Sequence, residues 1–212
     1  MTKTINPHFE GHVLDDEIRI TDRYSGMQTY IGINLAWHSI TKDVAEAFLQ
    51  SVCDHIMHVR TAGEMVGVDK HQLRWHDGTK LGVEEFPAYA RQFHGDKGDP
   101  TGFAESWLHH IHHNEHHWQH WIFPDGFTPK GSTVEDGVCW MEERWIKEMV
   151  ADWMGASMAY TGSWDMSDWL KANLPKVRLH SASWPTLKGV LRNLEHGYHN
   201  IMNELHVNGL IP

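Results

Sequence analysis

The segment WLHHIHHNEHHWQHW, residues 107–121, constrains the fold more than any other part of the chain. It holds seven histidines within twelve positions. On a helical wheel, Trp107, Ile111 and Trp118 share one side, and the other side is a face of imidazoles formed by His109, His113, His116 and His120, with His110 and His117 beside it. We therefore expect an amphipathic helix over 103–121 whose second face is imidazole rather than charge.

Imidazoles three, four or seven positions apart on a helix can bring two ring nitrogens to one metal ion. Two simpler interpretations remain open. The imidazole face can be solvated, or it can bind metal only adventitiously, as a purification tag does. Asn114 is also a position where the helix can break, and a break there changes which histidines converge.

A second feature is a histidine inside an apolar stripe. From Thr41 the hydrophobic period becomes helical, and the positions that share one side of the wheel are Phe48, Val52, Val59 and Val66. His55 lies about 20° from the centre of that stripe, so we expect it to face the core. A buried imidazole must be hydrogen-bonded or must bind a metal. A hydrogen-bonded core histidine is the alternative to a ligand.

Three carboxylates lie near the expected core, and one of them needs a cation or a fixed donor. Asp77 follows His76 at the end of a short helix expected over 71–77. Asp152 lies on the apolar side of a helix expected over 140–160, one turn after Glu148. An unpaired buried carboxylate is costly, so Asp152 requires a cation or a fixed donor. That cation is a metal ion or, alternatively, an arginine in an ordinary ion pair, with Arg74 and Arg91 as candidates.

Charge and composition limit the partners. The formal net charge is −10 and no run of Lys or Arg occurs, which excludes a surface suited to nucleic acid. A small anionic substrate is compatible with this charge, because a bound metal reverses the local potential. We find no apolar signal segment and no stretch of membrane-spanning length, and so expect a cytoplasmic protein without a membrane partner. Cys53 and Cys139 are expected as buried thiols, and the oligomeric state stays open.

The remaining pattern predicts a single all-α domain over 1–212. Further helices are expected over 83–93 and 186–205, with loops at 94–102 and 124–137. Residues 1–36 are polar and contain only short extended pieces, so we expect an irregular lead-in or a small hairpin there. About six helices within 41–205 then form a metal-binding core.

The order of these residues resembles the HD superfamily of metal-dependent phosphohydrolases. A histidine with an apolar residue four positions later is followed by a His-Asp doublet and then by a distant aspartate, here His55, His76-Asp77 and Asp152. The resemblance implies an HD-like helical bundle that hydrolyses a small phosphate ester, such as a nucleotide or a phosphorylated metabolite. It also implies that one divalent ion is held by His55, His76, Asp77 and Asp152.

Residues 55–160 also look like an uncharacterised family of small, histidine-rich bacterial and phage proteins. Its motifs occur here in order, as HDGTKL (76–81), EEFPAYA (84–90), SWLHHIHHNEHHWQHW (106–121) and KEMVADW (147–153). Two positions depart from the family's HD-x-S-K-F-like motif, because Thr79 replaces Ser and Leu81 replaces Phe. Both changes are conservative and keep Lys80 in place. This second resemblance implies no particular reaction.

Under the HD resemblance, further residues receive roles. Asp77 is expected to bridge to a second ion, whose other ligands are His109 with His113, or His110 with His117. Lys80 is a candidate contact for a substrate phosphate. Glu148 is a candidate general base, or a partner that orients a ligand.

Nitrogen and oxygen ligands without thiolate favour one or two ions of Mn, Fe, Co, Ni or Zn over Ca. Two rival functions stay open. A di-iron oxygenase would suit a histidine-rich site among many tryptophans, and would be coloured or redox-active as purified. A non-catalytic metal-binding or interaction protein would hold its ion with a full coordination shell, whereas a hydrolase keeps an open position beside Lys80 in a concave pocket.

The first prediction concerns Asp152. Replacing it with Asn keeps the shape of the side chain but removes its charge, so metal binding should weaken by roughly one to two orders of magnitude or more. Hydrolysis of a generic phosphate ester should fall with it. Calorimetric titration with metal measures the change, and unaltered affinity would make Asp152 a structural ion-pair partner.

Overall fold

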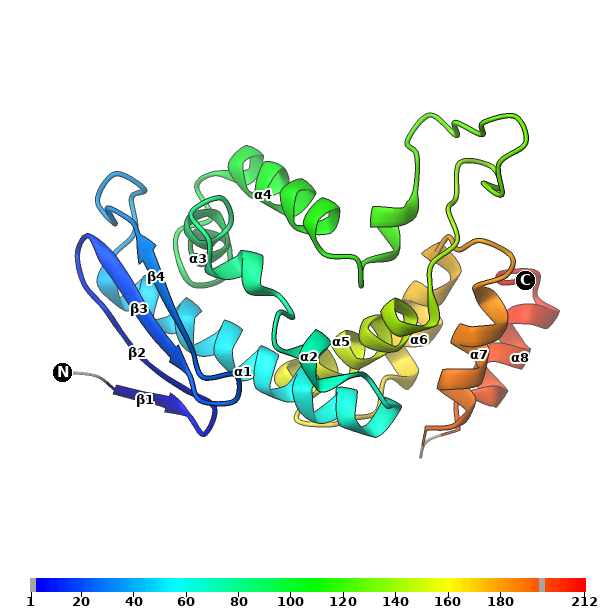
Figure 1. Ribbon diagram of the computed structural model, residues 1–212, viewed down its shortest axis with the longest axis horizontal. Helices are drawn as coiled ribbons and strands as arrows, with labels where there is room; N and C mark the ends of the chain where they lie inside the picture. Colours follow the sequence, from blue (N-terminus) through cyan, green and yellow to red (C-terminus); the bar gives the residue numbers. More distant parts are fainter. Residues whose placement is uncertain (1–2, 195–196) are drawn as a thin grey trace. The chain divides into compact units, whose positions relative to one another are not determined.

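The computed structural model of the protein describes residues 3–194 and 197–212 (Figure 1). The chain divides into two compact units. Unit 1 comprises Met1–Met57 and Arg74–Asn114, and unit 2 comprises His58–Leu73 and Glu115–Pro212. Helix α1, Lys42–Val66, supplies residues to both units. That the chain forms one domain over 1–212 stays a prediction.

Unit 1 begins with a four-stranded antiparallel sheet, drawn in blue in Figure 1. The strands follow one another in the order β1 (Lys3–Asn6), β2 (Phe9–Val13), β3 (Glu17–Asp22) and β4 (Met27–Gly32). The prediction of an all-α, HD-like bundle with an irregular lead-in is therefore wrong, and the fold is mixed α and β.

The sheet forms because buried and polar residues alternate along its strands, a pattern that the polar composition of residues 1–36 obscures. In β2 and β3, buried residues such as Phe9, Ile18 and Ile20 alternate with exposed or half-buried polar ones, which is the period of a strand with one buried face. That apolar face joins a core with Phe48 of α1 and with Phe86, the first residue of helix α3 (Phe86–His94). The two phenyl rings meet edge to face, with centroids 4.9 Å apart.

The predicted helix over 41–66 is confirmed as α1, and so is its apolar stripe. Phe48, Val52 and Val59 are buried, and Val66 is half-buried. The helix ends before Gly67, whose φ of 75° is a left-handed conformation that glycine adopts without strain.

The histidine-rich helix is shorter than predicted. Helix α4 runs from Pro100 to His113, with the Asp99 side chain accepting a hydrogen bond from the Gly102 backbone N–H as its N-terminal cap. Asn114 then adopts an extended conformation, and its side-chain amide donates to the backbone oxygen of His110 at 2.8 Å. The break at Asn114, which the sequence analysis left open, is confirmed, and the predicted continuation of the helix to 121 is wrong. The segment Trp118–Trp121 is a separate 3₁₀ turn, η2.

Unit 1 contains two further elements that flank the site. They are the 3₁₀ turn η1 (Gly78–Leu81) and the helix α3 (Phe86–His94). Each of α3, α4 and η1 packs against the other two, so the three elements form one cluster.

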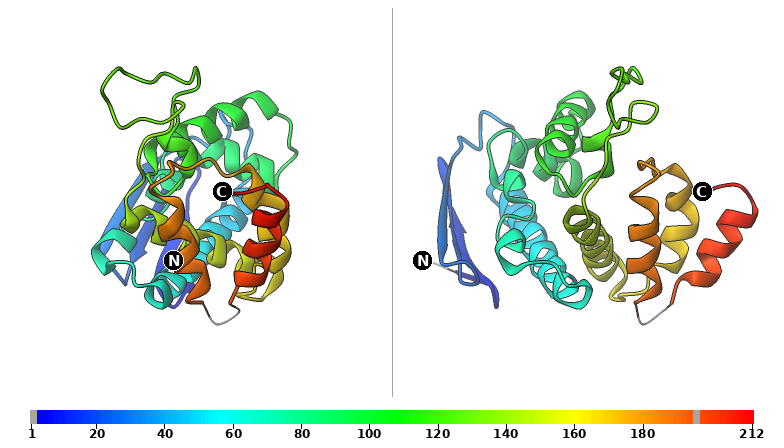
Figure 2. Two further views of the ribbon diagram at one scale, coloured as in Figure 1. Left: turned by 90° about the vertical axis from the view of Figure 1, so that its right-hand side faces the viewer. Right: turned by 45° about the vertical axis from the view of Figure 1, so that its right-hand side comes forward.

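The regular elements in the described part of unit 2 are helices, and a long loop precedes α5, Glu143–Thr161 (Figure 2). Its elements after the last turns of α1 are α2 (Lys70–Leu73), η2, α5 (Glu143–Thr161), α6 (Ser167–Asn173), η3 (Leu174–Lys176), α7 (Trp184–Arg192) and α8 (His199–Val207). Helix α7 packs against α5 and α8 around a core rich in Leu and Met. The structure thus has eight α-helices in its described part, not about six.

The single helix predicted over 186–205 is two helices, α7 and α8, and residues 195–196 between them lie outside the described residues. The loop predicted at 124–137 is confirmed as a long segment without regular helix before α5.

In the described ranges, no helix combines the length and the apolar character that crossing a membrane requires.

Two glycines of unit 2 give a test of its packing. A Cβ at Gly155 of α5 would lie 2.5 Å from Cγ2 of Val59 and 2.9 Å from its backbone nitrogen, so Gly155→Ala should destabilise the protein by about 1–3 kcal/mol. A Cβ at Gly189 of α7 meets no atom within 4 Å, so Gly189→Ala should stabilise it by about 0.5–1 kcal/mol. Urea unfolding of both variants measures the difference, and equal effects would contradict this packing.

Candidate metal centre

The site of unit 1 is built around the carboxylate of Asp77, which is fully buried. Asp77 lies between α2 and η1, and its backbone has a φ of 55° and a ψ of 18°, the left-handed region. This conformation costs a residue other than glycine of the order of 1–3 kcal/mol, although aspartate tolerates it better than most. Such strain at a buried carboxylate is typical of functional sites.

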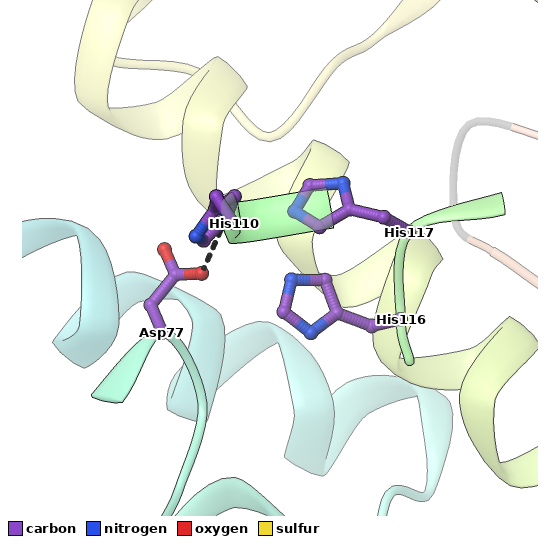
Figure 3. Close-up of side chains that lie close together, drawn as sticks. All are labelled: Asp77, His110, His116 and His117. Carbon is purple, nitrogen blue, oxygen red and sulfur yellow. Dashed lines mark ion pairs between the residues drawn. The ribbon is translucent and has the colours of Figure 1, made fainter. Parts of the chain in front are cut away.

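Four donor groups surround the two carboxylate oxygens of Asp77. Oδ2 lies 3.2 Å from Nε2 of His55, 3.7 Å from Nε2 of His76 and 2.5 Å from Nζ of Lys80. Oδ1 lies 3.3 Å from Nε2 of His110, and Figure 3 shows this ion pair. The two oxygens therefore face different sets of imidazoles.

The donors come from separate parts of the sequence. His55 reaches the site from α1, where its side chain is 14% exposed, as its place in the apolar stripe predicts. His76 is buried next to Asp77, and His110 is buried on α4. Lys80 reaches back from η1, three residues after Asp77.

The electrostatics keep Asp77 ionised. Burial acts to raise the pKa of its carboxyl group, but the charge of Lys80 and those of His76 and His110, together with the hydrogen bond from His110, hold that pKa well below its ordinary value of 3.8. The carboxylate is thus an acceptor and a potential metal ligand under ordinary conditions.

The spacing of these atoms suits a transition-metal ion. Ligand atoms of His55, His76 and Asp77 all lie within 4.8 Å of one another. Two ligands at about 2.1 Å from one tetrahedral ion are about 3.4 Å apart, which is close to the separations of these imidazole nitrogens from Asp77. His110 with Oδ1 has a similar spacing, 3.3 Å, and the role of Asp77 as a bridge between two ions stays a prediction.

A second buried carboxylate, that of Glu85, contacts His110, and the sequence analysis did not single it out. Glu85 is fully buried at the start of α3, where Oε2 lies 2.8 Å from Nδ1 of His110 and Oε1 lies 2.7 Å from Nδ1 of His109. Burial acts to raise the pKa of Glu85, but the hydrogen bond and charge of His110, with hydrogen bonds from Thr79 and His109, lower it overall. In the sequence, Glu85 was marked only by its place in the EEFPAYA motif, which Glu84 shares.

Two of the predicted histidines lie on the more exposed side of α4. His109 contacts Glu85, and its ring stacks on that of His113 with centroids 3.9 Å apart. Nδ1 of His113 donates to the backbone oxygen of His109 at 2.8 Å. Their role as ligands of a second ion stays a prediction.

The remaining predicted residues belong to unit 2. Glu148 is buried on α5, where Oε1 lies 3.4 Å from Nδ1 of His116 and the amide of Gln72 donates to Oε2. The ring of His117 neighbours that of His116, with centroids 4.4 Å apart (Figure 3). Asp152 is half-buried on α5. The roles predicted for Glu148, His117 and Asp152 stay predictions.

A pH titration of stability tests the electrostatics of Asp77. Its lowered pKa in the folded protein means that the charged carboxylate stabilises the fold above the ordinary pKa of about 4, and that this contribution is lost as the pH falls through the lowered value. In metal-free protein, the free energy of unfolding of the wild type should therefore lose its advantage over Asp77→Asn below about pH 4. Urea unfolding from pH 6 downwards measures this, and a difference that stays constant to pH 2.5 would refute it.

Comparison with known proteins places the chain in a family. Residues 44–202 match the model described as a Family of unknown function (DUF5662), so the match spans α1 to α8 and includes Asp77, Glu85 and His110. No curated protein and no solved structure matches the chain. The match covers most of the sequence, and the chain therefore belongs to DUF5662.

Proposed function

We propose that this protein is a metal-dependent hydrolase of a small phosphate ester. The observation that carries the proposal is the buried Asp77 carboxylate, whose two oxygens face the Nε2 atoms of His55 and His76 on one side and of His110 on the other. A desolvated carboxylate ringed by imidazole nitrogens at ligand spacing is costly to build unless it binds a cation. The order of His55 and His76-Asp77 in the chain, which resembles that of the HD phosphohydrolases, supports the same reaction.

In this proposal His55, His76 and Asp77 hold a divalent ion of the Mn, Fe, Co, Ni or Zn series, and His110 serves a second ion bridged by Asp77. An ion of this kind lowers the pKa of a bound water and so supplies a nucleophile at neutral pH. The chain's own residues hold the ion, exclude bulk water from Asp77, and bind the anionic part of the substrate.

Lys80 has two functions in this proposal. Its ammonium group, 2.5 Å from Oδ2 of Asp77, stands where a cation is needed and neutralises the carboxylate in metal-free protein. A bound ion takes over that role, and Lys80, whose side chain is 18% exposed, can then reach a substrate phosphate as a point charge. Lys80 therefore competes with the metal before it assists the substrate.

These two roles predict that removing the charge of Lys80 strengthens metal binding and slows hydrolysis. Lys80→Met should bind metal about tenfold more tightly, equivalent to about 1.4 kcal/mol, because the competing cation is gone. The same variant should hydrolyse phosphate esters roughly a hundredfold more slowly, because a cationic contact to the substrate is lost. Lys42→Met, at an exposed position of α1, is the matched control and should change neither quantity. Weaker metal binding in Lys80→Met would mean that Lys80 only supports the structure.

The proposal as a whole is tested by stripping the protein with a chelator and reloading it with each of the five ions in turn. Release of phosphate from p-nitrophenyl phosphate and from a panel of nucleotides should appear with at least one ion. It should vanish in Asp77→Asn and persist in Asp43→Asn, which alters an exposed residue of α1. Bound metal without phosphate release from any ester would refute the hydrolase, and oxygen consumption by the iron-loaded protein would favour an oxygenase instead.

A further inference from the structure

Glu85 has an unusual position for a buried acid. It precedes the first residue of α3, where an acidic side chain commonly caps the helix, but its carboxylate makes no capping hydrogen bond. Both oxygens instead meet adjacent residues of α4, Oε1 at His109 and Oε2 at His110. The carboxylate of Glu85 therefore binds residues of α4 and does not cap α3.

The two contacts fix the protons on both rings. An ionised carboxylate can only accept hydrogen bonds, so Nδ1 of His109, at 2.7 Å, and Nδ1 of His110, at 2.8 Å, must each carry a proton. Without a metal, Nε2 of His110 donates to Oδ1 of Asp77, 3.3 Å away. When a metal ion replaces that proton, the proton on Nδ1 stays, and the neutral ring has its lone pair on Nε2. This is the tautomer in which His110 binds a metal through Nε2 on the side of Asp77.

Neighbouring residues hold Glu85 and His110 in place. The hydroxyl of Thr79 hydrogen-bonds to Glu85 and lies 3.3 Å from Nδ1 of His110. The amide of Asn114 donates to that hydroxyl at 2.9 Å and to the backbone oxygen of His110. Thr79, Glu85 and His110 come from three separate stretches of the chain, and this network of hydrogen bonds joins them.

We propose that Glu85 is a positioning residue that sets the tautomer of His110, so that Nε2 is presented to a metal ion beside Asp77. The inference rests on the proposed metal site and deepens it. His109 completes the arrangement, since it binds the second oxygen of Glu85 and, at 30% side-chain exposure, links the buried carboxylate to the surface of α4. Glu85 and His110 thus form a carboxylate–histidine pair of the kind that orients metal ligands.

The test compares Glu85→Gln with Glu84→Gln, the exposed neighbouring glutamate. A glutamine amide has only one acceptor oxygen, so its NH₂ group must face one of the two imidazoles and forces the proton of that ring onto Nε2. Cobalt(II), followed by calorimetry and by its visible absorption, is the probe. We expect Glu85→Gln to bind cobalt about 10–100-fold more weakly and with an altered spectrum, and Glu84→Gln to match the wild type.

A second measurement needs no substitution at Glu85. Long-range ¹H–¹⁵N correlation spectra of metal-free wild-type protein report which ring nitrogen of His110 carries the proton. The signals of His110 are assigned as those missing from the spectrum of His110→Asn. A proton on Nδ1, with Nε2 unprotonated or protonated together with it, supports the inference. A proton on Nε2 alone would overturn it, even if Glu85→Gln fails to fold.

The outcomes separate this inference from the proposed function. If the wild type binds cobalt, and Glu85→Gln binds it equally well although its His110 carries the proton on Nε2, the positioning role of Glu85 is refuted while the metal site stands. If the wild type does not bind cobalt at all, both are refuted.

Discussion

The carboxylate of Asp77 is the constraint on which the arrangement of unit 1 depends. It is fully buried, its backbone is held in a left-handed conformation, and it is charged in spite of burial. Such a group is tolerated only where the surroundings supply positive charge or hydrogen-bond donors. The histidine of α1, the lysine of η1 and the histidine of α4 all point at it, which is why these separate segments pack together.

Much of this arrangement could be predicted from the sequence. His55 falls in a long, regular apolar stripe, so its burial beside a polar partner follows from helical periodicity alone. The His76-Asp77 doublet is visible as a pair because its members are adjacent. Lys80 follows at a distance of three residues, which is within reach of the same carboxylate on a tight turn.

Other features could not be predicted, for identifiable reasons. The strands over 3–32 are short and separated by tight turns, and their buried residues alternate with polar ones, so they lack a continuous apolar run. Glu85 cannot be told from Glu84 in a single sequence, although one is buried and the other exposed. Asn114 is recognisable in the sequence as a position where the helix can break. That the break occurs depends on its side chain hydrogen-bonding to Thr79 and to its own helix, a tertiary contact that no periodicity reveals. Local pattern thus located the first candidate ligands, while tertiary contacts decide which histidines lie beside them.

Anomalous diffraction from crystals of cobalt- or zinc-loaded protein, collected at the absorption edge of the metal, tests the central claim most directly. Our account predicts an anomalous peak about 2.0–2.2 Å from Nε2 of His55, Nε2 of His76 and Oδ2 of Asp77, with the ammonium group of Lys80 moved away from the carboxylate. A peak confined to the exposed imidazoles of α4, or no peak with Lys80 still bound to Asp77, would contradict it.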